Sequence, residues 1–232
     1  MTLQHSGAYA TTAGVPAQPQ VPVRQRVGEP VPAALAALSE TSALRDLRGR
    51  SGCSPRALAF AAGDVVVVSG LPGSGKSTLI KRTVRSPRID SQDTRDRWDA
   101  ATPRFLPYAL YRPFVRMAHY AGLRKALRSG HSVVVHDCGT QAWVRRWLAR
   151  QARRRGAALH LLLLDVPPDV AREGQRERGR GVSGYAFARH RRAAGRLIAD
   201  AEAGRTPFGC ASVTLLDRPA ATTLTRIGFR AE

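Results

Sequence analysis

The chain of 232 residues is long enough for one sizeable domain with extensions and short for two full domains. With 43% hydrophobic and 23% charged residues it has the composition of a soluble globular protein. No stretch approaches the ~20 apolar residues that cross a bilayer, which excludes a membrane-spanning protein and predicts no membrane partner. The formal net charge of +20 comes from 34 arginines and 3 lysines against 17 acidic residues, and such a positive surface attracts polyanions.

Cysteine usage and the N-terminus bear on the cellular compartment. Cys53, Cys138 and Cys210 lie far apart and form no CxxC pair, so we expect reduced thiols rather than a disulfide framework. The N-terminus lacks a basic start followed by an apolar core, so it contains no recognisable secretory signal. These features predict a cytoplasmic protein.

The first part of the chain differs in composition from the rest. Residues 1–30 contain four prolines among Gln, Ala, Thr and Gly without apolar periodicity, which predicts a flexible tail. From Val31 onward leucines recur at helical spacing, Leu44 and Leu47 among them, so residues 31–62 are predicted to form a helical extension of two short helices. Residues 63–232 then form the main domain.

Strand and helix signals alternate along the main domain. Short apolar runs predict strands over 64–69, 132–136, 159–165 and 212–216, with 88–89 as a further edge strand. Helical patterns cover 75–84, 114–129, 141–155, a segment from Pro168, 183–203 and a short final helix. Strands separated by helices predict an α/β fold with a central parallel sheet of about five strands flanked by helices.

The most specific motif lies between the first predicted strand and helix. Residues 70–77 read Gly-Leu-Pro-Gly-Ser-Gly-Lys-Ser and match the pattern GxxxxGK followed by Ser or Thr without a mismatch. Glycines let the backbone N–H groups turn toward phosphates, and the helix N-terminus adds positive charge. The motif predicts that Lys76 contacts the β- and γ-phosphates and that the Ser77 hydroxyl binds Mg²⁺. The predicted nucleotide-binding residues are Gly70, Leu71, Pro72, Gly73, Ser74, Gly75, Lys76, Ser77 and Thr78.

The remaining motifs favour phosphoryl transfer over regulated hydrolysis. The chain has no guanine-reading NKxD-like segment and no LSGGQ-like segment. The strand at 133–135 is followed by His136, Asp137 and Cys138, without the Glu that usually activates water. A kinase does not need that Glu, because its nucleophile is an aligned substrate hydroxyl. Asp137, at the carboxyl end of a strand, is predicted to contact Mg²⁺ or substrate.

These motifs together resemble the small P-loop kinases grouped with polynucleotide kinase, chloramphenicol phosphotransferase and zeta-toxin-like proteins. The resemblance covers roughly residues 63–217. It rests on Gly70–Thr78, Asp93 with Arg95, Val133–Asp137 followed by Arg145, Asp165-Val-Pro-Pro and the arginine-rich run 172–180. Where polynucleotide kinases often have Asp-Asn-Thr-Asn, this chain has Asp137-Cys138-Gly139-Thr140.

The resemblance implies roles for further residues. It implies that a carboxylate after the second strand accepts the proton of the acceptor hydroxyl, namely Asp93, with Asp90 as the alternative. It implies that a mobile lid supplies arginines to the transferring phosphate, among Arg172, Arg176, Arg178 and Arg180; Arg176 and Arg178 are our candidates. Arg95 and Arg145 are candidates for substrate binding.

The basic segment 141–196, with 14 arginines against 4 acidic residues, has three interpretations. It could be a nucleic-acid face, a phosphate-binding lid or a solvated helix surface. Gly179 and Gly181 could act as hinges for a lid that begins at Pro168.

The leading hypothesis is therefore an ATP- and Mg²⁺-dependent kinase that acts on a hydroxyl of a small-molecule or nucleotide-like acceptor. One alternative is a 5′-hydroxyl polynucleotide kinase that binds nucleic acid through the 141–196 face. The other is a nucleotide-binding regulatory module with little turnover. We expect segment 96–120 to build the acceptor pocket.

Overall fold

The computed structural model describes residues 43–50, 54–85, 88–90, 108–136, 141–179 and 181–230. The predicted tail 1–30 and the beginning of the predicted extension lie outside these residues. The elements are β1 (Leu44–Asp46), β2 (Ala57–Phe60), β3 (Val65–Gly70), α2 (Lys76–Thr83), β4 (Arg88–Asp90), α4 (Tyr108–Arg128), β5 (Val133–His136), α5 (Ala142–Arg153), β6 (Leu159–Leu164), α6 (Pro168–Arg176), α7 (Gly184–Glu202), β7 (Ser212–Leu216), α8 (Arg218–Thr223) and β8 (Arg226–Phe229).

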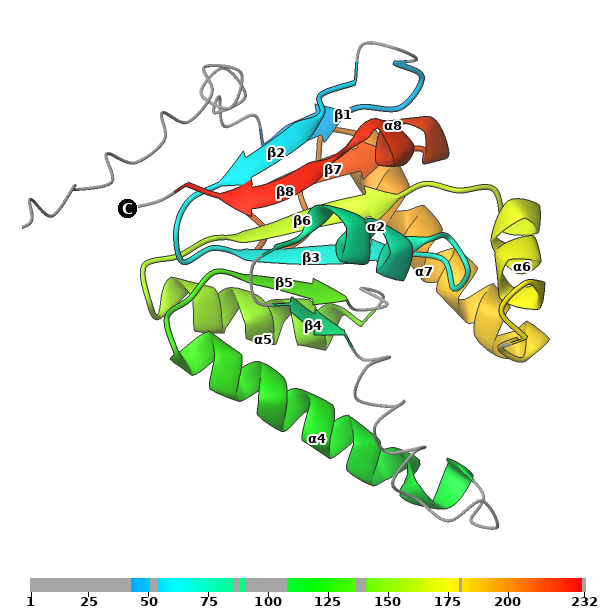
Figure 1. Ribbon diagram of the computed structural model, residues 1–232, viewed down its shortest axis with the longest axis horizontal. Coiled ribbons are helices and arrows are strands. Elements are labelled where there is room, and N and C mark those ends of the chain that lie inside the picture. Colours follow the sequence, from blue (N-terminus) through cyan, green and yellow to red (C-terminus); the bar gives the residue numbers. More distant parts are fainter. Residues whose placement is uncertain are drawn as a thin grey trace, which may run out of the picture. The chain divides into compact units, whose positions relative to one another are not determined.

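Six strands form one parallel sheet in the order β1-β7-β6-β3-β5-β4 (Figure 1). The strand before the glycine-rich motif, β3, lies in the middle, where Val65 pairs with Val133 of β5 on one side and with Leu159 of β6 on the other. A second, two-stranded parallel ladder joins β2 to β8. Because all six strands run the same way, their carboxyl ends meet at one edge of the sheet, and the glycine-rich motif follows the central strand there.

Helices cover both faces of the sheet. Val66 and Val68 pack with α2, α8 and the β2–β8 ladder in one core cluster. Val65 and Val67 pack with α4, α5 and α7 in the other. Side chains alternate between the faces of a strand, so a strand covered on both sides reads as a continuous apolar run. This explains why β3 and β6 are buried along their whole length.

The predicted fold class is confirmed, and the sheet contains one strand more than the five or so predicted. The additional strand is β1, whose Leu44 pairs with Val213 of β7. The helical prediction for this part of the extension is therefore wrong. Leu44 packs with one core cluster and Leu47 with the other, an arrangement typical of a strand but not of one helix face. No helix within the described ranges is both long and apolar enough to span a membrane.

Candidate nucleotide-binding site

The glycine-rich motif forms a tight loop between the end of β3 and the start of α2. This P-loop (residues 70–78) needs glycine at two positions in particular. Gly73 has φ of 87° and Gly75, the N-cap of α2, has φ of 94°, both in the left-handed region that other residues rarely adopt. The loop therefore turns directly into the N-terminus of α2, where the first backbone N–H groups of a helix lack intrahelical partners and can bind an anion.

Lys76 begins α2 and is 5% exposed. Its ammonium group donates hydrogen bonds to the carbonyl oxygens of Gly70 at 3.1 Å and Leu71 at 2.7 Å. A buried charge is costly unless it is paired or hydrogen-bonded, and the loop carbonyls meet that need here. The same position would let the ammonium turn to a phosphate oxygen bound in the loop.

Ser74 provides a test of whether the loop fits an anionic ligand. Its side chain is buried, and among the described residues its Oγ atom has no hydrogen-bond partner. A buried hydroxyl without a partner costs free energy, and such groups often mark a place that a ligand or water completes. Ser77 is half-buried and Thr78 exposed on the first turn of α2.

A cleft of about 490 Å³ opens beside the P-loop. This volume lies within the range of about 300–1,000 Å³ usual for small-molecule sites. It is lined by the P-loop and α2, the C-terminal half of α6 with the following turn, and the start of α8. The lining residues include Gly73, Ser74, Gly75, Thr78, Arg82, Glu173, Gly174, Glu177, Arg178, Arg218 and Thr222.

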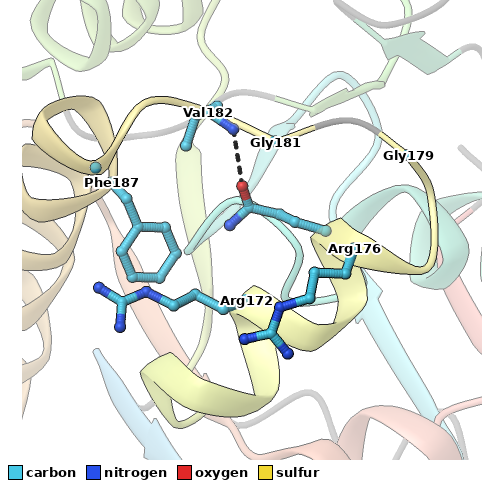
Figure 2. Close-up of a pocket in the computed structure, with 8 residues that line it drawn as sticks. Arg172, Arg176, Gly179, Gly181, Val182 and Phe187 are labelled. Atoms are coloured by element: carbon cyan, nitrogen blue, oxygen red, sulfur yellow. Dashed lines mark hydrogen bonds between the residues drawn. The ribbon is translucent and has the colours of Figure 1, made fainter.

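Among the described arginines of the run 172–180, Arg178 lines the P-loop cleft. Arg176, one of our two catalytic candidates, is exposed, forms an ion pair with Glu173 and lines a second cavity of about 270 Å³ between α6 and α7. Figure 2 shows this second cavity with Arg172 directed toward Phe187, and the guanidinium carbon of Arg172 lies 4.8 Å from the ring centroid. The arginine-rich run thus faces two different cavities.

The sequence did not indicate that α6 packs directly on the P-loop. A β-carbon added to Gly174 would lie 2.6 Å from the carbonyl oxygen of Gly73, and one added to Gly73 would lie 1.9 Å from that of Ala171. Gln175 adds a hydrogen bond from its amide nitrogen to the carbonyl oxygen of Pro72, 3.1 Å away. A glycine inside a helix did not by itself indicate this contact, because Gly122 of α4 is also a helical glycine and has no neighbour at the same distance.

Asp165, the first residue of the Asp-Val-Pro-Pro motif, has a structural partner. Arg48 donates to it at 2.7 Å and also binds Asp46 and Glu202, each at 2.7 Å. The hydrogen bonds to Asp46, followed by those to Asp165 and Glu202, raise the pKa of Arg48 above its usual value despite partial burial. The motif therefore links the segment before α6 to the turn after β1.

Several candidate residues are not placed at the cleft. Arg145 lies half-buried on α5 and is not among the residues that line it. Asp90 is the last residue of β4 and pairs in register with His136, at the same sheet edge as the P-loop. Asp93, Arg95, Asp137 and Arg180 lie outside the described residues. Within the described part of the chain no three His, Cys, Asp or Glu side chains form a metal-binding group.

Comparisons with known proteins agree with this fold. The family model for the AAA domain matches residues 65–201, more than half of the chain. A chain of the PezAT toxin–antitoxin system of Streptococcus pneumoniae has a TM-score of 0.50 at 13% sequence identity, over 82% of this chain and 80% of that chain. No curated protein sequence matches.

Two further solved structures are similar at lower scores. The tunicamycin resistance protein of Deinococcus radiodurans has a TM-score of 0.39 at 20% identity, over 60% of this chain and 82% of that chain. A gluconokinase from Sinorhizobium meliloti has a TM-score of 0.41 at 19% identity, over 72% of this chain and 93% of that chain. At such identities the similarity concerns the fold alone.

Proposed function

This chain belongs to the AAA domain family, and on that premise we propose that it is an ATP- and Mg²⁺-dependent kinase. It would transfer the γ-phosphoryl group of ATP to a hydroxyl of a small-molecule or nucleotide-like acceptor. The observation that carries the proposal is the P-loop itself, with buried Lys76 held by loop carbonyls, beside a cleft that Arg178 lines.

The charges around the cleft suit a nucleotide with its phosphates at the P-loop. Lys76 and the N-terminus of α2 would bind the phosphates, and the Ser74 hydroxyl could complete its hydrogen bonding there. Arg178 would stabilise the charge spread over the transferring phosphoryl group. Ser77, together with Asp137, would hold Mg²⁺, which would supply positive charge to offset that of the phosphates.

The acceptor hydroxyl would be oriented by Asp93, which would accept its proton. The end of β4 at Asp90 supports this proposal, because the segment that begins there follows a strand at the P-loop edge of the sheet. Asp90 remains the alternative base, three residues upstream. Arg95 and Arg145 are proposed to bind the acceptor, and Arg145 lies near the N-terminus of α5, the helix that follows β5.

A second candidate function is 5′-hydroxyl polynucleotide kinase. Exposed arginines lie on both α5 and α7, which contribute to the same core cluster: Arg146, Arg150, Arg153, Arg189, Arg192 and Arg196. These arginines could contact the phosphates of a nucleic acid. Binding of the nucleic acid would then weaken steeply as the salt concentration rises. Arg155 does not belong to this set, because its guanidinium donates to the carbonyl oxygens of Leu127, His131 and Gly63.

The test of the proposed function is ADP formation from Mg·ATP with a panel of sugars, nucleosides, aminoglycoside-type alcohols and 5′-hydroxyl oligonucleotides. ADP formed only with an oligonucleotide would favour the second candidate over the first. Mg·ATP binding without turnover on any acceptor class would instead favour a nucleotide-binding regulatory module. A chain that neither binds nor turns over Mg·ATP would contradict all three.

A further inference from the structure

Gln175 lies between the P-loop and the segment that leads into α7. It is the last but one residue of α6, and it is 8% exposed although most neighbouring side chains of the arginine-rich run are exposed. A buried glutamine is stable only if both its donor and its acceptor are used. Gln175 uses both, and each with a different part of the site.

The donor side of the Gln175 amide binds the P-loop. Its nitrogen donates to the carbonyl oxygen of Pro72 at 3.1 Å. The helix backbone around it is pressed against the same loop through Gly174 and Gly73. A displacement of the P-loop at residues 72–73 would therefore have to move the C-terminal half of α6 or break this contact.

The acceptor side of the amide binds the connection between α6 and α7. Its oxygen accepts a hydrogen bond from the backbone N–H of Val182 at 3.0 Å, the dashed line in Figure 2. Val182 immediately precedes Ser183, the N-cap of α7, whose hydroxyl accepts from the Ala186 amide at 3.3 Å. The glutamine thus fixes the point at which the chain returns from the lid to α7.

We propose that Gln175 is a positioning residue that couples the P-loop to the α6–α7 connection. When phosphates fix the P-loop, the Pro72 carbonyl holds the Gln175 amide, and the amide in turn holds Val182 and the turn that carries Arg178. This step rests on the proposed nucleotide site. It assigns the coupling to one side chain, because among the described residues Gln175 is the side chain that hydrogen-bonds both Pro72 and Val182.

Two substitutions of similar shape separate the two halves of this link. Gln175→Met keeps the length of the side chain and removes both hydrogen bonds. Gln175→Glu, ionised at pH 8, keeps an acceptor for Val182 but has no donor for Pro72. Gln151→Met on α5, which packs on the opposite face of the sheet, is the matched control.

Hydrogen–deuterium exchange without nucleotide tests the contact to Val182 independently of the proposed function. Peptides covering residues 177–187 should exchange about fivefold faster in Gln175→Met, the effect of one net hydrogen bond on a local opening equilibrium. Gln151→Met should exchange as the unsubstituted protein does, and Gln175→Glu, which keeps the acceptor for Val182, should exchange more slowly than Gln175→Met. Unchanged exchange in Gln175→Met would overturn the proposal whether or not the protein binds a nucleotide.

Exchange at saturating Mg·ADP tests the coupling itself. In the unsubstituted protein and in Gln151→Met, we expect the nucleotide to slow exchange in the same peptides. Gln175→Glu should still bind Mg·ADP, as shown by its thermal shift, yet the slowing should be lost. If Gln175 had only a structural role, a variant that still binds Mg·ADP would also show the slower exchange. Equal slowing in Gln175→Glu would overturn the coupling, whereas absence of any Mg·ADP thermal shift in the unsubstituted protein would overturn the proposed function instead.

Discussion

Gly174 of α6 and Gly73 of the P-loop are in direct backbone contact, so close that a β-carbon at residue 174 would lie 2.6 Å from the Gly73 carbonyl oxygen. We expect Gly174→Ala to lower the free energy of unfolding by ~1–3 kcal/mol, because overpacking against backbone outweighs the gain in helix propensity. Urea unfolding measures the change. The loop should also bind Mg·ATP more weakly, because α6 would be forced away from it.

Gly122 provides the matched control for this substitution. It is also a helical glycine, on α4, and an added β-carbon there would meet no atom within 4 Å. Gly122→Ala should therefore raise the free energy of unfolding by about 0.5–1 kcal/mol. If Gly174→Ala stabilised the protein to the same extent, the described contact between α6 and the P-loop would be wrong.

The lid arginines should affect turnover more than binding of ATP. Arg178 lines the P-loop cleft, so we expect Arg178→Ala to lower kcat by at least ~10²-fold, with a much smaller rise in KM for ATP. Arg176→Ala is predicted to act in the same direction. Steady-state kinetics with the acceptor found in the screen measure both. Arg128→Ala, on α4, is the control. If turnover were unchanged in both Arg176→Ala and Arg178→Ala, the arginine-rich run 172–180 would be only a solvated surface.

Asp93 is predicted to be the base. Asp93→Asn should leave Mg·ATP binding unchanged and lower phosphoryl transfer by roughly 10²-fold or more, because the acceptor hydroxyl loses its proton acceptor. Isothermal titration and kinetics on the same preparation separate the two effects. If Asp90→Asn alone gave this result, the role would belong to the carboxylate at the end of β4.

Much of the site could be predicted because its signals are local. The backbone turn of the P-loop requires its glycines, and α6 and α7 begin at residues that favour the start of a helix. Pro168 occupies the first position of α6, and the Ser183 hydroxyl caps α7. These preferences depend on neighbouring residues in the sequence, so the sequence carries them in full.

What could not be predicted depends on distant parts of the chain. Leu44 and Leu47 fit a helical spacing, but pairing with β7 at the sheet edge makes their segment a strand. The short strand β8 is paired with β2, more than 160 residues earlier, so no local pattern marks it. In the sequence, Gln175 is one polar residue among arginines. Its proposed positioning role follows only from its contacts with Pro72 and Val182.

A buried polar group away from the P-loop should control stability at acid pH. Asp64 hydrogen-bonds His160 at 3.0 Å and the amides of Ala158 and Ala61, and His160 also contacts Ser212 at 2.7 Å. Burial alone would raise the pKa of Asp64, but the hydrogen bonds from His160 and from these amides outweigh it, so its pKa lies below the usual 3.8. The carboxylate therefore stabilises the fold above pH 3.8, and this contribution is lost as the pH falls through the lower, folded-state pKa.

Asp64→Asn should lower the free energy of unfolding by about 1.5–3 kcal/mol at pH 7, since it removes hydrogen bonds to a buried charge. The difference from the unsubstituted protein should shrink as the pH falls below 3.8. Urea unfolding over this pH range measures both. A difference that is constant with pH would show that the charge of Asp64 is not what stabilises the fold.

The central claim, that residues 70–78 bind the phosphates of ATP, is tested most directly by thermal unfolding with and without Mg·ATP. A ligand that binds only the folded state at 100 times its Kd adds ~2.7 kcal/mol of stability, so the unsubstituted protein should unfold at a clearly higher temperature with Mg·ATP and less so with ATP and EDTA. Lys76→Ala should lose most of that shift. Lys81→Ala, at an exposed position of the same helix, should keep it. Equal shifts in the unsubstituted protein and in Lys76→Ala would contradict the assignment of the P-loop.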